Sequence, residues 1–259
     1  MAKFGENGAP RQSGAMGASR PARFDSPASK EAYVRDMFSR IAGRYDLLNR
    51  VLSFRQDVRW RRLAAVAAGV GPGDRVLDLA TGTGDLAFAL AKRVRPDGAV
   101  VGVDFAEPML AQARAKAPHV PEGELCRFEN HNALALPFAD GSFAAVTMAF
   151  AMRNVADIQA SFAEMRRVVR PGGRVVCLEL NKPVFRPFRA LYFAYFYGLV
   201  PRLSRLWQRE ADPYTYLPNS LTDFPDQEAL AELMRGVGLR EVRYRNLSGG
   251  IAALHVGVV

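Results

Sequence analysis

The stretch that most constrains this 259-residue chain is a short apolar run that ends in an acid and enters a glycine-rich turn. Residues 76–79 read Val-Leu-Asp-Leu, residues 80–85 read Ala-Thr-Gly-Thr-Gly-Asp, and residues 86–91 continue in helix-forming apolar residues. Strand, tight turn and helix together bring a nucleoside cofactor against bare backbone at the carboxyl end of a parallel sheet. The stretch therefore predicts a nucleoside-cofactor site in an α/β fold.

Two cofactor classes compete for this turn. Gly82-x-Gly84-x-x-Ala87 fits the dinucleotide fingerprint, and Asp104 follows at about the 20-residue distance of a ribose-binding acid. Asp78 argues for the other class, because a carboxylate beside the turn repels a pyrophosphate. S-adenosyl-L-methionine (SAM) carries an ammonium and a sulfonium and no phosphate. The acid therefore favours SAM, and a nicotinamide dinucleotide is the rival.

Apolar runs and helical patterns alternate after the turn, which is typical of a mostly parallel sheet with helices on both faces. Near the end of the chain, one helix precedes two strands that predict an antiparallel edge. We expect a Rossmann-like α/β fold of the class I SAM-dependent methyltransferase type with a seven-stranded sheet. The expected strands are 75–79, 99–103, 124–128, 143–150, 174–180, 241–246 and 252–258, and the later helices are 107–117, 158–169 and 228–237.

Composition divides the chain into a tail and one domain. Residues 1–29 are rich in Gly, Ala, Ser and Pro, and we expect a disordered tail there. A single domain is expected over 30–259, with a helical cap at 30–70 and a helical lid inserted at 183–222 before the last strands. The apolar run at 190–200 in that insertion is far shorter than the roughly 20 residues of a membrane-spanning helix.

Charge and cysteine content narrow the partners. The net charge is +9, which favours contact with nucleic acid or an anionic membrane surface, or else reflects solvated basic faces alone. The two cysteines, Cys126 and Cys177, have neither metal-ligand spacing nor a disulfide framework. We therefore expect no metal site and a reducing, cytoplasmic location.

Several stretches together resemble the C-methyltransferases of ubiquinone and menaquinone biosynthesis. The most specific are Phe-Ala-Met-Arg-Asn-Val at 150–155, where the family usually reads Phe-Gly-Leu-Arg-Asn-Val, and Tyr-x-Tyr-Leu at 214–217. Residues 38–49, 136–140, 170–173 and 249–255 match as well, so the likeness runs from about Val34 to the end. Residues 53–61 and 177–179 are most similar to the menaquinone branch. Ala151 and Met152 depart from the family pattern beside the expected acceptor site.

The resemblance implies SAM-dependent methylation of a prenylated quinol on a ring carbon, most simply demethylmenaquinol to menaquinol. The ubiquinone-pathway methylation of a 2-methoxy-6-polyprenyl-1,4-benzoquinol is the alternative. The acceptor must be reduced, because a hydroquinone oxygen feeds electron density into the ring whereas a quinone ring is electrophilic. Peripheral contact with the inner face of the cell membrane and a homodimer are left open.

The family motifs also imply site residues. Arg153, Asn154 and Tyr45 are the expected catalytic residues at the acceptor, with Arg153 stabilising a phenolate. Alternative roles are a salt bridge from Arg153 to Asp157 and simple packing for Tyr45. His255 is a candidate base that is more simply structural. The expected cofactor-binding residues are Asp78, Gly82, Thr83 and Gly84 at the methionine part, Asp104 at the ribose, and Asn132 and Ala133 at the adenine.

A nucleic-acid methyltransferase is the remote alternative that the basic charge suggests. Methyltransferases that act on exocyclic amines carry an Asn/Asp-Pro-Pro-aromatic run after the fourth strand, whereas this chain reads Ala-Phe-Ala-Met-Arg at 149–153. It also has no Pro-Cys nucleophile for pyrimidine chemistry. We therefore expect no nucleic-acid partner. A SAM-binding scaffold without activity is a further alternative, which predicts cofactor binding but no turnover.

Overall fold

A computed structural model describes residues 26–185, 187, 192, 220–221 and 224–259. Most of the predicted insertion at 183–222, the Tyr-x-Tyr-Leu motif and all but the last residues of the predicted tail lie outside these residues. Helix α1 begins at Pro27, ahead of the expected start at residue 30. The reason is local, because the Ser26 hydroxyl caps the helix by accepting a hydrogen bond from the Ser29 amide.

Seven strands form one sheet in the order β3-β2-β1-β4-β5-β7-β6. Strands β1 to β5 pair in parallel, while β7 runs antiparallel to both β5 and β6. This arrangement confirms the predicted fold class, including its antiparallel edge. The strands are β1 (Arg75–Leu79), β2 (Ala99–Asp104), β3 (Cys126–Asn130), β4 (Phe143–Ala149), β5 (Val169–Leu180), β6 (Arg240–Leu247) and β7 (Ala252–Val258).

Two strand starts differ from the prediction by more than one residue. Strand β5 begins at Val169 rather than at residue 174, because Val169 pairs with Phe143 across an irregular register. The predicted Pro-Gly-Gly turn therefore lies within this strand, where the backbone of Gly172 and Gly173 bonds to Val259. Strand β3 begins at Cys126 because a 3-10 turn occupies Gly123–Leu125.

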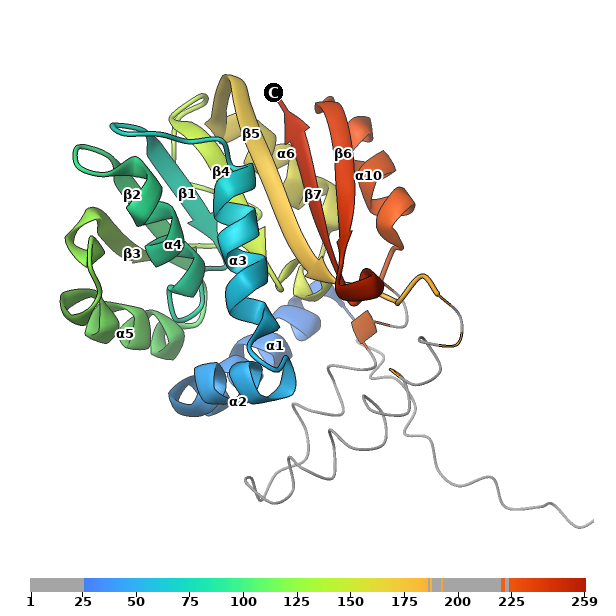
Figure 1. The fold of residues 1–259 in the computed structure, drawn as a ribbon, viewed down its shortest axis with the longest axis horizontal. Coiled ribbons are helices and arrows are strands. Elements are labelled where there is room, and N and C mark those ends of the chain that lie inside the picture. Colours follow the sequence, from blue (N-terminus) through green and yellow to red (C-terminus); the bar gives the residue numbers. More distant parts are fainter. Residues whose placement is uncertain (1–25, 186, 188–191, 193–219, 222–223) are drawn as a thin grey trace, which may run out of the picture.

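Helices cover both faces of the sheet, so the core has two layers (Figure 1). Val76 and Val100 face one layer with α3 and α4, and Leu77 and Val101 face the other with α6 and α10. Alternate strand residues point to opposite faces, which explains why these buried strands are apolar throughout. The helices are α1 (Pro27–Ile41), α2 (Tyr45–Leu52), α3 (Gln56–Ala67), α4 (Asp85–Val94), α5 (Glu107–Lys116), α6 (Ile158–Val168) and α10 (Gln227–Gly236).

Helices α1 and α2 lie below the carboxyl end of the parallel strands, where α/β folds bind their ligands (Figure 1). A 3-10 turn, Ala42–Arg44, joins them. Among the described residues, no helix combines the length and apolar character needed to cross a bilayer.

Candidate active site

The glycine turn after β1 places bare backbone at the carboxyl edge of the sheet. Gly82 and Gly84 both have positive φ, at 57° and 86°, which a residue with a Cβ adopts only at a cost. A Cβ on Gly84 would also lie 3.0 Å from the rings of Phe88 and Phe128. The turn therefore depends on glycine for its conformation and, at Gly84, for close packing as well.

Asp104 ends β2 beside this turn and holds it in place. One carboxylate oxygen accepts a hydrogen bond from the Gly82 amide at 2.9 Å, and the other accepts one from the Ala106 amide at 2.9 Å. Burial raises the pKa of Asp104, and these backbone bonds partly oppose that rise. Each carboxylate oxygen can accept a further bond, so the group can bind ribose hydroxyls without leaving the turn.

Asp78 lies behind the turn and not in the cleft. Its carboxylate is 1% exposed and accepts hydrogen bonds from the hydroxyls of Thr81 at 2.6 Å and Thr147 at 2.7 Å. Burial raises the pKa of Asp78 from 3.8 to about 6, although both threonines oppose the rise. Asp78 therefore joins the turn to β4.

A cleft opens between this turn, the cap and the ends of β2 and β4. Six of the ten predicted site residues line it. The ten divide into Tyr45, Gly82, Asp104, Asn132, Ala133 and Asn154, which line the cleft, and Asp78, Thr83, Gly84 and Arg153, which do not. The structure thus brings the residues predicted for ribose, adenine and acceptor to one cleft.

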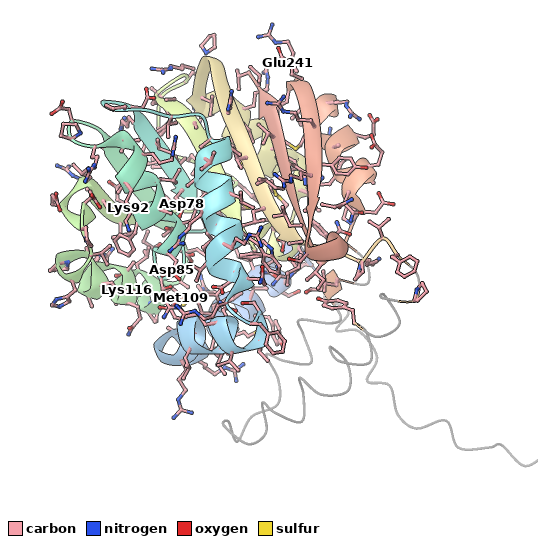
Figure 2. The ribbon with its side chains drawn as sticks, in the orientation of Figure 1. Asp78, Asp85, Lys92, Met109, Lys116 and Glu241 are labelled. Atoms are coloured by element: carbon pink, nitrogen blue, oxygen red, sulfur yellow. The ribbon has the colours of Figure 1, made fainter. Side chains whose placement is uncertain are left out.

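Thr83 joins the turn to the cap. Its hydroxyl donates a hydrogen bond of 2.6 Å to Asp46 at the start of α2. Asp46 also pairs with Lys116 of α5 at 2.6 Å, and Lys116 pairs with Asp85 of α4 at 2.9 Å. Figure 2 shows Asp85 and Lys116 together above α2. This network fixes α2 at the rim of the cleft.

Arg153 is held away from the cleft by a buried ion pair. Its guanidinium pairs with Glu179 of β5 and donates a hydrogen bond of 3.0 Å to the Phe150 carbonyl. Asp157, the alternative salt-bridge partner of Arg153 in the sequence analysis, instead caps α6 by accepting a hydrogen bond from the Ala160 amide. The i,i+4 rule did not apply, because Arg153 lies in the 3-10 turn Met152–Asn154 and α6 begins only at Ile158.

Asn154 lines the cleft and has an unsatisfied side chain. Both polar atoms of its amide are buried and have no hydrogen-bond partner among the residues that the structure describes. Lys30 of α1 donates hydrogen bonds to the carbonyls on either side, at 3.2 Å to Arg153 and 2.8 Å to Val155. Buried unpaired amides are rare in folded proteins, so this one is available for a ligand.

The cap and the adenine loop complete the cleft. Tyr45 packs edge-on against Phe38 with ring centroids 5.9 Å apart, and burial raises the pKa of its hydroxyl. The Asn132 side chain accepts a bond of 2.8 Å from the Leu134 amide and donates one of 3.3 Å to Glu31 of α1.

Three further polar residues shape this region without having been predicted. Glu179 could have been suspected as an acid at the end of a buried strand, but no local pattern marks Lys30 or Glu31.

His255, the candidate base, is buried in β7, where its Nε2 lies 2.8 Å from the Gln227 carbonyl. It does not line the cleft.

Known proteins similar to this chain define its family. The family described as the ubiE/COQ5 methyltransferase family matches residues 27–259. A demethylmenaquinone methyltransferase of Thermus thermophilus is 51% identical over 221 residues, which cover 85% of this chain and 99% of the relative. A ubiquinone/menaquinone biosynthesis C-methyltransferase UbiE of Geobacter sulfurreducens is 45% identical over 86% of this chain and 87% of the relative.

Solved structures agree on the fold. A SAM-dependent methyltransferase of Aquifex aeolicus has a TM-score of 0.55 at 18% identity and covers 92% of this chain and 100% of its own. Another from Thermotoga maritima, described as a possible histamine N-methyltransferase, has a TM-score of 0.57 at 18% identity, over 86% and 98% of the two chains. The chain belongs to the ubiE/COQ5 methyltransferase family, and its cofactor is SAM.

Proposed function

We propose that this protein methylates a prenylated quinol on a ring carbon, with demethylmenaquinol as the preferred acceptor. The observation that carries the proposal is the cleft that is lined by both Asp104 and Asn154, whose side-chain amide has no partner among the described residues. The names of relatives on both branches support a quinone-type acceptor, and the 51% identical relative supports the menaquinone branch. The ubiquinone-pathway benzoquinol is the second candidate.

The cleft fits SAM on its own chemistry. We assign the ribose to Asp104 and the adenine to Asn132 and Ala133, while Gly82 leaves room for the methionine part. When bound, SAM supplies an electrophilic methyl group. The Asp78 carboxylate favours a cationic ligand through its field and, with Thr83 and Gly84, maintains the shape of the turn.

The acceptor lies, in this proposal, against Asn154 and Tyr45. The Asn154 amide holds a ring oxygen, since it has both a donor and an acceptor to offer. Tyr45 stays protonated at neutral pH because burial raises its pKa, so its hydroxyl donates a hydrogen bond and is no base. Arg153 acts on the ring oxygen only through its field and chiefly fixes the turn that carries Asn154.

Proton removal from the quinol hydroxyl activates the ring carbon. Among the described residues that line the cleft, the carboxylates are Glu31 and Asp104. Asp104 is already engaged by two backbone amides, so we assign the proton to water in the cleft, near Glu31. The chain's main contribution is alignment of donor and acceptor and exclusion of bulk water.

Contact with other molecules completes the proposal. A prenylated acceptor resides in lipid, so we propose a cytoplasmic protein with peripheral contact at the inner face of the membrane. A homodimer is compatible with this function. The chain lacks the motif of the amine-methylating enzymes, and this argues against a nucleic-acid substrate.

Labelled SAM tests the function directly. The protein is incubated with reduced demethylmenaquinone, with the reduced benzoquinol precursor, and with each oxidised quinone. We expect label in the naphthoquinol, less in the benzoquinol and none in the oxidised forms. Asn154→Leu should abolish transfer and leave SAM binding by calorimetry unchanged. Equal labelling of oxidised quinone, or full activity of Asn154→Leu, would overturn the assignment.

A further inference from the structure

Helix α2 presents an apolar face to solvent. Leu47, Val51 and Phe54 follow one another at four- and three-residue spacing, so they share one side of the helix and its following turn. Their exposed fractions are 63%, 39% and 75%. The adjoining side is apolar as well, and Leu48 there is buried in a small cluster with Leu221. The helix is therefore amphipathic, and one edge of its apolar face is exposed to solvent.

Positive charge surrounds this outer face. Residues 44–62 contain six arginines and two aspartates. Arg50 and Arg55 are exposed beside the apolar side chains, and Arg50 also lies 3.7 Å from the carboxylate of Asp85. Both aspartates are engaged by other groups, because Asp46 pairs with Lys116 and Asp57 with Arg61. The charge that the face offers to solvent is therefore basic.

The face lies next to the cleft. Tyr45, the first residue of α2, lines the cleft, and Asp46 is bonded to Thr83 of the glycine turn. In Figure 1, α2 lies at the lower edge of the coloured elements, at the carboxyl end of the sheet. A surface that rests against α2 is thus within one helix diameter, about 10 Å, of the proposed acceptor site.

We propose that the outer face of α2, formed by Leu47 and Val51 with Arg50 and Arg55, docks on an anionic lipid bilayer. The apolar side chains enter the boundary between headgroups and acyl chains, and the arginines contact lipid phosphates. Stable attachment requires two such signals together, and this face carries both. The proposal deepens the proposed function, because a prenylated quinol then reaches the cleft without crossing water.

A basic charge favours lipid over the other occupants of an apolar face. A second copy of this chain would bring the same arginines against one another and repel. An anionic bilayer neutralises them instead. The exposed arginines Arg59 and Arg62 continue up the outer side of α3, so the basic surface extends beyond the apolar patch.

Vesicle sedimentation of the full-length protein tests the proposal. The probes are phosphatidylcholine vesicles with and without phosphatidylglycerol, at ionic strengths of about 0.05 and 0.5 M. The test variant is Leu47→Gln combined with Val51→Gln, since glutamine favours helix and Phe54 has a left-handed backbone that a substitution would disturb. The matched control is Val66→Gln, because Val66 is 55% exposed at the far end of α3.

Wild type and Val66→Gln should bind the anionic vesicles and lose binding in high salt. The double variant should bind at least about tenfold more weakly. Unchanged binding of the double variant, or equal binding to neutral vesicles, would overturn the proposal. A change in oligomeric state of the double variant by ultracentrifugation would also overturn it, since the face would then join two copies.

Failure here is distinguishable from failure of the proposed function. Vesicle binding is measured without SAM or quinol, and methyl transfer is measured with an acceptor dispersed in detergent. The double variant should retain full transfer to that acceptor and an unchanged melting temperature. Loss of transfer in detergent would place Leu47 and Val51 in the active site and refute the surface role.

Discussion

Replacing Asp78 with asparagine should stabilise the folded protein near neutral pH and weaken SAM binding at the same time. The Asp78 carboxylate is buried and accepts bonds only from two threonine hydroxyls, so its charge is poorly compensated. Asparagine has nearly the same shape and no charge. It can accept a bond from one threonine and donate to the other.

The size of the effect follows from the pKa. A rise from 3.8 to about 6 corresponds to about 3 kcal/mol by which the folded state disfavours the ionised form. Because the folded pKa lies above the ordinary value, this cost is fully present above pH 6 and disappears as the pH falls to about 4. Allowing for weaker bonds to asparagine, we expect Asp78→Asn to gain about 1–3 kcal/mol at pH 8 and nothing at pH 4.

Urea unfolding of both proteins at pH 4.5, 6 and 8 measures this difference. His255 contributes with the opposite sign, because burial lowers its pKa and its stabilising effect is lost as the pH falls below 6.5. Since His255 is present in both proteins, its contribution cancels in the comparison. A variant no more stable than wild type at pH 8, or a difference independent of pH, would refute the reasoning.

Calorimetry measures the functional side of the same substitution. A cationic ligand favours the ionised form of Asp78, so the affinity of wild type for SAM should fall as the pH falls through about 6. Asp78→Asn should bind SAM about tenfold more weakly at pH 8, which is the effect of about 1.4 kcal/mol, and lose this pH dependence. Tighter binding of SAM by the variant would contradict the electrostatic role.

Three other substitutions test individual contacts. Arg153→Met should lower the free energy of unfolding in urea by about 3–5 kcal/mol, because it leaves Glu179 buried and unpaired. Adding Glu179→Met to the same chain should recover most of this loss. Equal losses in the single and double variants would refute the pairing. Lys30→Met should raise the KM for the acceptor and leave the SAM affinity unchanged, because Lys30 fixes the turn that carries Asn154. Lys30→Arg should leave both quantities unchanged. A parallel loss of SAM affinity in Lys30→Met would contradict this role. Gly84→Ala should lower the free energy of thermal unfolding by about 1–3 kcal/mol. The control Gly43→Ala should leave it unchanged, because a Cβ at Gly43 meets nothing within 4 Å. Equal melting temperatures of the two variants would show that the turn tolerates a side chain.

The fold was predictable because its signals are local and periodic. Buried parallel strands appear in the sequence as continuous apolar runs, and Gly82 and Gly84 indicate a turn that has positive φ at both positions. The sheet then brings Asp104 and Asn154 together, since Asp104 ends β2 and Asn154 follows β4, the two parallel strands on either side of β1. These residues are far apart in the chain, yet topology alone predicts that they share a cleft.

The partners of charged residues were not predictable in the same way. Arg153, in the turn after β4, pairs with Glu179 of the neighbouring strand β5, and no spacing rule connects residues 26 positions apart. Lys30 reaches the same turn from α1, at a sequence distance of more than one hundred residues. The exposed edge of α2 was equally hidden, because the buried Leu48 and the exposed Leu47 belong to one apolar stripe that periodicity does not divide.

Polar contacts of the cap link one short segment to both sides of the cleft. Glu31 contacts Asn132, Lys30 contacts the turn that carries Asn154, and Asp46 contacts Thr83 in between. Hydrogen bonds of this kind, half-exposed, contribute about 1 kcal/mol each. Apolar contacts add to them, because Val34 and Met37 of α1 and Leu48 of α2 are buried, and burying a side chain of this size contributes about 1.5–3 kcal/mol. The cap is therefore held mainly by its apolar contacts, while its polar contacts fix the positions of the residues that line the cleft.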